Sequence, residues 1–339
     1  MPRPAMSATP LQIGDVTIPG RVLTAPMTGV SDLPFRRTAS ACGAPYVATE
    51  MVACDSFARG RPDVVRRAAI GAKDDEQALP LMVIQLVGRT PEWIGKGAAL
   101  AEDAGAHIID LNMGCPAKEV TGALSGSALM REPDLAAKLI GAAVNATTRP
   151  VTLKMRLGWD DASRNAPQIA AMAEELGVAA ITVHGRTRQQ FYSGKADWKA
   201  VAAVKAAVAI PVIVNGDITD VASARDALSL SGADAVMIGR GAYGRPWIAD
   251  SINRALDMNT EMSEPGFTHR LDIALTHFGQ TLRFYGDALG LKVFRKHLGW
   301  YVEQASRPAD PQQRRVTKSH LCRIDTASGV EAALTALWT

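Results

Sequence analysis

The sequence contains no long apolar run. Its apolar stretches, such as Ala209–Val214, fall far short of the ~20 residues that a helix needs to cross a bilayer, so we expect no membrane segment. The first stretch, Met1–Gln12, also lacks the basic start and the apolar core of about 7–15 residues found in secretory signals. Apolar residues make up 47% and charged residues 21% of the 339 residues, which is typical of a globular protein. The sequence therefore predicts a soluble, cytoplasmic protein.

Cysteine is scarce as well. The four cysteines are scattered along the chain and form no C-x-x-C pair, which argues against a disulfide framework and against a zinc cluster. We accordingly expect no metal centre, and each thiol is considered by itself. The four are Cys42, Cys54, Cys115 and Cys322.

The net charge is small, at +3, but it is unevenly distributed. Residues 269–325 carry ten basic and five acidic side chains, whereas residues 1–268 carry 27 basic and 28 acidic ones. Such a cationic segment indicates a polyanionic partner, although it is equally typical of the solvated surface of an ordinary basic domain. The basic residues are Arg270, Arg283, Lys292, Arg295, Lys296, Arg307, Arg314, Arg315, Lys318 and Arg323.

Short apolar segments rich in β-branched residues alternate with helical patterns over the first two thirds of the chain. Strands that are apolar throughout and regularly separated by helices favour a parallel sheet, and eight such units favour an α/β fold of the (β/α)8 TIM-barrel type. A doubly wound open sheet is the alternative. The eight expected strands are Val22–Thr24, Tyr46–Thr49, Leu81–Leu86, His107–Leu111, Val151–Met155, Ala180–His184, Val212–Asn215 and Ala235–Ile238.

The last quarter of the chain has a different pattern. A polar stretch with Pro and Gly at 257–268 is typical of a linker, and the apolar positions beyond it keep helical spacing without strand-like alternation. We therefore predict an N-terminal extension at 1–10, a barrel domain at 11–256, the linker, and a smaller all-helical domain at 269–339.

In a (β/α)8 barrel the reactive side chains lie at the C-terminal ends of the strands. The loops after the seventh and eighth expected strands, Asn215–Asp217 and Gly239–Gly244, are rich in glycine. We expect their backbone N–H groups to bind a phosphate, with Arg240 adding positive charge. The second loop also matches G-x-G-x-x-G, but the helices that follow do not supply the further β-α units of a dinucleotide fold.

Lys154 ends the fifth expected strand, where desolvation of an unpaired ammonium would be costly. It needs an anionic partner, and the N1–O2 edge of a reduced flavin would be one. Gln85 and His184 lie at two other strand ends and could hydrogen-bond the same ligand. A Schiff-base lysine, which barrel aldolases place on a strand in the same way, is the competing interpretation.

Cys115 follows the fourth expected strand, in a turn that Gly114 and Pro116 would hold in place. This position favours a chemical role, either as a thiolate nucleophile or as a thiol that gives up a proton. With an unperturbed pKa of about 8.5 the thiol is mostly protonated at neutral pH, which suits an acid. The other three cysteines are interpreted as packing residues.

Four motifs together resemble those of the tRNA-dihydrouridine synthase family, over about residues 11 to 325. The motif that contains Cys115 is the most specific of them. Two further segments, Pro116–Lys118 and Gly244–Ile248, resemble the bacterial B-type branch. The four motifs are Ala25–Asp32, Asp110–Pro116, His184–Arg188 and Asn215–Ile218.

The resemblance implies reduction of FMN by NADPH or NADH, hydride transfer to C6 of a uridine in tRNA, and protonation of C5 by Cys115. The branch implies a uridine of the D-loop, at tRNA position 17. Asn112, Arg186 and Arg188 are expected by position to contact the base or nearby phosphates. The residues that the resemblance assigns to FMN are Ala25, Pro26, Met27, Gln85, Lys154, His184, Asn215, Gly216, Asp217, Gly239 and Arg240.

Two other functions remain open at this stage. An FMN barrel that oxidises or reduces a small molecule, such as a dihydroorotate-type dehydrogenase, would share the phosphate site but would not need the basic helical segment. A non-catalytic RNA-binding protein with a barrel fold would need neither Cys115 nor Lys154. We expect tRNA as the macromolecular partner, no membrane partner, and a monomer.

Overall fold

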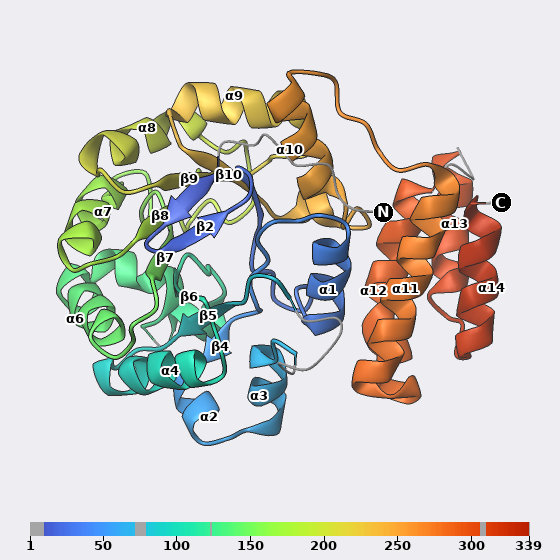
Figure 1. Ribbon diagram of the computed structural model, residues 1–339, viewed down its shortest axis with the longest axis horizontal. Coiled ribbons are helices and arrows are strands. Elements are labelled where there is room, and N and C mark those ends of the chain that lie inside the picture. Colours follow the sequence, from blue (N-terminus) through green and yellow to red (C-terminus); the bar gives the residue numbers. More distant parts are fainter. Residues whose placement is uncertain (1–9, 72–78, 123, 306–309, 339) are drawn as a thin grey trace.

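The computed structural model describes residues 10–71, 79–122, 124–305 and 310–338. Its centre is an eight-stranded parallel sheet with helices outside it (Figure 1). The strands are buried along their whole lengths, except for Val87 of β5 and Ala53 of β4, which explains why they are largely apolar. In sheet order they are β3 (Val22–Thr24), β10 (Ala235–Ile238), β9 (Val212–Asn215), β8 (Ala180–His184), β7 (Val151–Arg156), β6 (Ile108–Met113), β5 (Val83–Val87) and β4 (Val52–Ala53).

The segment 46–49 joins the two edges of this sheet. Thr24 pairs with Val47 and Ala48 pairs with Val83, both in the parallel sense. This segment was expected to be a full strand, but it makes one bridge on each side, and the regular strand β4 begins only at Val52. The bridges confirm the (β/α)8 barrel and exclude the open sheet.

The outer helices follow the strands in turn. In α4 (Pro91–Asp103) the buried positions Ile94, Ala98 and Ala101 lie three or four residues apart and face the barrel. The other elements of the ring are α1 (Leu33–Ala41), α2 (Cys54–Ala58), α3 (Pro62–Ala68), α5 (Lys118–Thr121), α6 (Pro133–Val144), α7 (Ala166–Glu175), α8 (Trp198–Ala207), α9 (Val221–Ser231) and α10 (Ile248–Met258), with 3₁₀ turns η1 (Gly126–Arg131) and η2 (Arg240–Ala242).

A small antiparallel hairpin, β1 (Leu11–Ile13) with β2 (Val16–Ile18), lies across one end of the barrel (Figure 1). Its turn residue Gly14 has φ +58°, and a Cβ there would lie 2.8 Å from Pro150, which directly precedes β7. The hairpin therefore covers the N-terminal end of the strands. The sequence analysis did not anticipate it, because three-residue strands carry too little periodicity.

Among the described residues, four helices follow α10: α11 (Phe267–Tyr285), α12 (Asp287–Gln304), α13 (Pro311–Leu321) and α14 (Ala327–Trp338). They enclose an apolar core of their own, around Phe278, Phe294 and Tyr301, and α11 packs against α1 of the barrel. The division at 257–268 stays a prediction; residues 260–266 lie outside helices and strands. Residues 1–9 of the predicted extension and Arg307 are outside the described residues. Among the described helices, none is long and apolar enough to cross a membrane.

Candidate functional site

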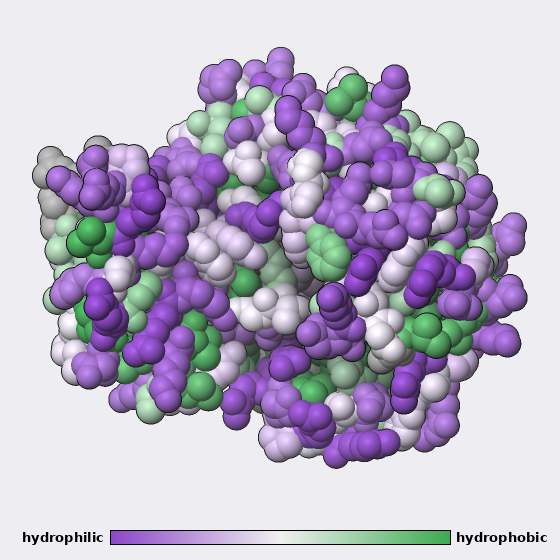
Figure 2. Space-filling view, turned by 180° about the vertical axis from the view of Figure 1, so that it is seen from behind, coloured by the Kyte–Doolittle hydropathy of each residue, from purple (hydrophilic) through white to green (hydrophobic). Residues whose placement is uncertain are grey.

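A cavity of about 880 Å³ opens at the C-terminal ends of the strands. Figure 2 shows this face of the molecule, opposite to the hairpin, with a hollow near its centre. The volume is within the ~300–1,000 Å³ of small-molecule sites. Of the predicted site residues, all but Arg186 and Arg188 line it: Ala25, Pro26, Met27, Gln85, Asn112, Cys115, Lys154, His184, Asn215, Gly216, Asp217, Gly239 and Arg240.

The Lys154 ammonium projects from β7 into the cavity wall and donates to Asn215 Oδ1 at 3.1 Å. The Asn215 amide cannot turn around freely, because its Nδ2 donates to the carbonyl of Met237 at 2.7 Å. Burial lowers the pKa of Lys154 to about 8, while the nearby carboxylate of Asp110 acts in the opposite direction. The side chain is therefore mostly charged at neutral pH and keeps two further N–H donors for a ligand.

His184 is neutral in this site. Burial, followed by the positive charges of Arg156 and Lys154, lowers its pKa well below the usual range. Its Nε2 lies 3.3 Å from the Arg186 guanidinium, which can only donate, so Nε2 is the acceptor. The proton of the neutral ring is then on Nδ1, and the imidazole can offer that N–H to a ligand.

Cys115 lies half-buried in a turn directly after β6. Its backbone N–H donates to Asn112 Oδ1 at 3.0 Å, and its carbonyl accepts from the Ser127 hydroxyl at 2.8 Å. Gly126 has φ +57°, and a Cβ there would lie 2.9 Å from the Cys115 carbonyl oxygen. Burial raises the pKa of the thiol, so it is protonated at neutral pH. The turn thus presents a thiol, not a thiolate, to the cavity.

The two glycine-rich loops lie side by side after β9 and β10. Gly216 has φ +118°, and a Cβ there would lie 2.9 Å from the His184 ring; a Cβ on Gly241 would lie 2.5 Å from the carbonyl oxygen of Ile218. Both positions therefore require glycine. By contrast, no atom lies within 4 Å of the Cβ position of Gly239, so the backbone there is open to an approaching ligand.

Asp217 places a carboxylate beside these loops, and two arginines neutralise it. It accepts from Arg186 at 2.6 Å and lies 3.4 Å from Arg240. Partial burial works to raise the pKa of Asp217, but the hydrogen bonds from Arg186 and from the Ala196 N–H outweigh it and hold the pKa below its usual range. The three side chains together carry one net positive charge, which suits an anionic ligand.

Arg186 and Arg188 lie beside the cavity without lining it. Arg186 is 1% exposed and also donates to the carbonyls of Ser193 and Gly194. The Arg188 guanidinium lies over the rings of Trp159 and Phe191, at 4.6 and 4.7 Å. Their predicted contacts with substrate stay predictions, and the geometry shows both arginines holding the loop after β8.

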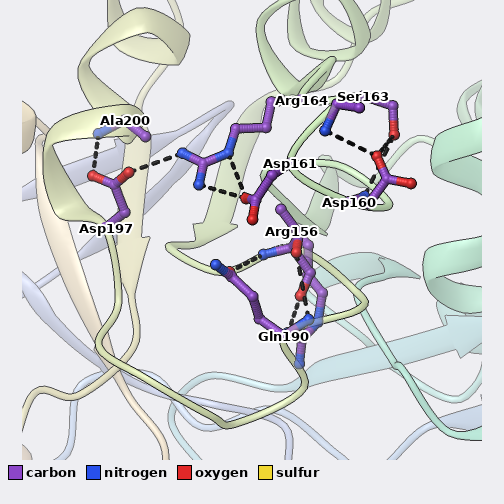
Figure 3. A network of polar contacts seen from close by, with 10 residues as sticks. Arg156, Asp160, Asp161, Ser163, Arg164, Gln190, Asp197 and Ala200 are labelled. Atoms are coloured by element: carbon purple, nitrogen blue, oxygen red, sulfur yellow. Dashed lines mark hydrogen bonds and ion pairs between the residues drawn. The ribbon is translucent and has the colours of Figure 1, made fainter.

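That loop, residues 185–197, is tied to the loop after β7. Arg164 pairs with Asp161 at 2.7 Å and with Asp197 at 2.9 Å, and Gln190 Oε1 accepts from the Thr187 N–H at 2.8 Å (Figure 3). The Arg164–Asp197 pair joins the two loops, and each of the other two bonds lies within one loop.

The sequence analysis did not assign roles to Arg156 and Asp110. Arg156 lines the cavity and donates to the carbonyl of Gly114 at 2.7 Å and to those of Thr187 and Phe191 at 2.9 Å. Burial lowers its pKa to about 10. The period-2 alternation of strands could have found both residues, because Arg156 shares a face with Lys154, and Asp110 shares one with Asn112.

The donor set fits FMN. Lys154 and the neutral His184 ring provide donors for an anionic ring system, the apolar Ala25, Pro26 and Met27 supply a wall for it, and the open backbone at Gly239 suits a phosphate. In the part of the chain that the structure describes, no group of three or more His, Cys, Asp or Glu side chains is arranged to hold a metal ion.

Comparison with known proteins gives concordant results. The family model described as "Dihydrouridine synthase (Dus)" matches residues 23–334. A probable tRNA-dihydrouridine synthase of Rhodobacter capsulatus is 51% identical over 296 residues, covering 87% of this chain and 90% of that protein. The tRNA-dihydrouridine synthase B of Xanthomonas campestris is 43% identical over 300 residues, covering 88% of this chain and 89% of that protein.

Among solved structures, morphinone reductase in complex with tetrahydroNAD matches with a TM-score of 0.54 at 17% identity, over 79% of this chain and 94% of that one. This likeness shows the fold alone. The sequence matches are far stronger, and by their extent and identity the chain belongs to the dihydrouridine synthase family.

Proposed function

We propose that this protein is a tRNA-dihydrouridine synthase, an FMN-dependent oxidoreductase that reduces the C5–C6 double bond of a uridine in the tRNA D-loop. The observation that carries the proposal is the convergence of a protonated thiol, Cys115, and an ammonium, Lys154, on one cavity. Family membership and the names of the relatives support it.

Bound FMN, reduced by NADPH or NADH, supplies the hydride that is added to C6 of the uracil ring. Lys154 would hold a positive charge against the flavin, Gln85 and the Nδ1–H of His184 would hydrogen-bond it, and Ala25, Pro26 and Met27 would contact it. The loops at Asn215–Asp217 and Gly239–Arg240 would bind its phosphate. An ammonium role for Lys154 is preferred over a Schiff base, because the side chain is mostly charged at neutral pH, whereas a Schiff base forms from the neutral amine.

Cys115 acts as the acid. When hydride reaches C6, the thiol gives its proton to C5 and is later reprotonated from solvent, so the base gains two hydrogen atoms. The raised pKa of the thiol favours this role, since a protonated group is needed at neutral pH.

Asn112 would bind the uracil through a donor. Its Oδ1 already accepts from the backbone N–H groups of Gly114 and Cys115, and one N–H of its Nδ2 is donated to Gln85. Only the second N–H remains for a ligand. Asn112 therefore selects a ring carbonyl oxygen, which uracil has at C2 and C4.

The basic helices α11–α13 would hold the tRNA through its phosphates while the uridine is turned out of the RNA into the cavity. The enzyme would act as a monomer in the cytoplasm, on position 17 of the tRNA D-loop, which is the position that the resemblance to the B-type branch implies.

The test is an assay of the purified, FMN-loaded protein with NADPH and unmodified tRNA, with dihydrouridine measured by mass spectrometry. Wild type should add two hydrogen atoms per modified uridine, and Cys115→Ala should still be reduced by NADPH but yield little dihydrouridine. Reduction of the flavin without change in the tRNA would favour a dehydrogenase of a small molecule. A protein that binds no flavin and ignores NADPH would favour a non-catalytic RNA-binding role.

A further inference from the structure

A buried carboxylate lies beneath the cavity and is not accounted for by the proposed mechanism. Asp110 on β6 is 2% exposed. Its Oδ2 accepts from Gln85 Nε2 at 2.5 Å, and its Oδ1 accepts from the Thr152 hydroxyl at 2.7 Å. A buried charge is expensive unless it is hydrogen-bonded, so a carboxylate at this position calls for an explanation.

The hydrogen bonds of Asp110 set the direction of two amides in sequence. An ionised carboxylate can only accept, so Gln85 must turn its Nε2 towards Asp110. Gln85 Oε1 is then left to accept from Asn112 Nδ2 at 2.8 Å. Asn112 in turn presents Oδ1 to the backbone N–H of Cys115 at 3.0 Å. Each amide has one orientation that satisfies both neighbours, and the carboxylate selects it.

We propose that Asp110 is a positioning residue for Cys115, acting through Gln85 and Asn112, and that it thereby also determines which group of Asn112 faces the uracil. The inference rests on the proposed function, because it assigns Cys115 the part of proton donor. Asp110 itself does not line the cavity and reaches it only through Gln85.

The surroundings of Asp110 allow it to remain charged at neutral pH. Burial raises its pKa to about 6, while the hydrogen bonds from Thr152 and Gln85 and the positive charge of Lys154 act in the opposite direction. Tyr46, on the closing segment 46–49, also lies close enough to interact with it and is neutral, since burial raises the pKa of its phenol. Protonation of Asp110 at lower pH would turn it into a possible donor, and the amides of Gln85 and Asn112 could then reverse their orientations.

A merely structural network would respond differently from a directional one. In a structural network any lost hydrogen bond lowers stability and activity together. In a directional network, a substitution that keeps shape but removes the pure acceptor disturbs Cys115 even when the protein remains folded. Asp110→Asn is that substitution, because an amide can present either a donor or an acceptor to Gln85.

The matched control is Thr152→Val, which removes the other hydrogen bond of Asp110 and leaves the bond to Gln85. Both variants are compared with wild type as FMN-loaded proteins. The readouts are reduction of the flavin by NADPH, kcat and KM for dihydrouridine formation in tRNA, and the rate at which iodoacetamide alkylates Cys115 at several pH values, followed by peptide mass spectrometry.

For Asp110→Asn we expect flavin reduction within about twofold of wild type, kcat on tRNA lowered by about 10- to 100-fold with KM little changed, and a several-fold change in the alkylation rate of Cys115. Thr152→Val should show neither of the last two changes. Should Asp110→Asn not fold, Gln85→Leu removes the hydrogen bond between Gln85 and Asn112 instead. It must then also change the alkylation rate of Cys115 several-fold.

Equal effects of Asp110→Asn and Thr152→Val, or wild-type alkylation and kcat in Asp110→Asn, would overturn the proposal. Failure of the proposed function is recognised separately, because wild type would then make no dihydrouridine. Alkylation of Cys115 still reports on the hydrogen bonds from Asp110 through Gln85 and Asn112 to Cys115 in that case.

Discussion

The hydroxyl of Tyr285, at the end of α11, donates to Asp32 Oδ2 at 3.1 Å, while Asp32 Oδ1 accepts from the Phe35 N–H and caps α1. One carboxylate thus joins the C-terminal helices to the loop 25–31, which reaches the cavity through Ala25, Pro26 and Met27.

Tyr285→Phe should destabilise the protein by about 1–2 kcal/mol, because it removes a hydrogen bond to a buried carboxyl while keeping the ring and its contact with Arg66. The measurement is the midpoint of urea-induced unfolding. Tyr192→Phe, at a position 53% exposed, is the control and should leave that midpoint in place. An unchanged midpoint in Tyr285→Phe would show that the bond is not formed in solution.

The protein should lose stability in acid because of two buried histidines, one on α11 and one on α12. Burial lowers the pKa of His277 to about 3, and that of His297 well below the usual range. Each folded-state pKa is depressed below the unfolded value, so the stabilisation is complete above ~6.5 and is lost as pH falls, at about 1.4 kcal/mol per pH unit and histidine. Melting temperatures between pH 7 and 4 should fall steeply for wild type and less steeply for His297→Gln. His269→Gln, at an exposed position, should keep the wild-type slope.

Gly241→Ala should damage the loop after β10, which we propose to bind the flavin phosphate. Its Cβ would lie 2.5 Å from the carbonyl oxygen of Ile218, so the loop after β10 or the one after β9 has to move. We expect a lower FMN content, measured from the flavin absorbance per protein, and a lower melting temperature. Gly141→Ala on α6 has open space around its Cβ and should be neutral or stabilise by about 0.5–1 kcal/mol. Equal FMN content in both variants would contradict the assignment of the loop.

Lys154→Met should make the bound flavin harder to reduce. The substitution removes the positive charge next to Asn215 while filling a similar volume. Every 1.4 kcal/mol of lost stabilisation corresponds to about 30 mV for a two-electron couple, so we expect the midpoint potential to fall by tens of millivolts. Spectroelectrochemical titration measures it, and Lys138→Met on the surface of α6 should have the wild-type potential.

Binding of tRNA should depend strongly on salt, and part of that dependence should come from α12. Lys292 and Arg295 are both exposed there. Replacing both with Ala should weaken binding and reduce the slope of log Kd against log salt by about 1–2. Lys138→Ala serves as the control, since α6 lies on the side of the barrel away from α11–α14 (Figure 1). A slope equal to that of wild type would place the phosphate contacts elsewhere.

The sequence was sufficient for the barrel and for most of the cavity, because buried parallel strands are largely apolar and the polar residues towards their C-terminal ends stand out. Lys154, His184 and Asn215 were found in this way, and the structure brings them together. It was not sufficient for the hairpin β1–β2, or for closure by single bridges at Val47 and Ala48, since neither produces a periodic pattern.

The position of Arg186 shows a second limit. A charged residue two positions beyond a strand end is as well placed to contact substrate as to support a loop, and only its hydrogen-bond partners distinguish the two. Here those partners are the carboxylate of Asp217 and two backbone carbonyls. The direction of the amides of Gln85 and Asn112 is likewise visible only once Asp110 has been located in space.

The hairpin across the N-terminal end of the barrel has a kinetic consequence. Its buried residues Leu11, Ile13 and Ile18 close that end, so the cavity of the described chain is reached from the opposite face. A nicotinamide donor and a uridine would have to approach the flavin through the same entrance. They would then take turns, with the oxidised dinucleotide leaving before the RNA arrives, and steady-state rates measured against both reactants should give parallel lines in a double-reciprocal plot.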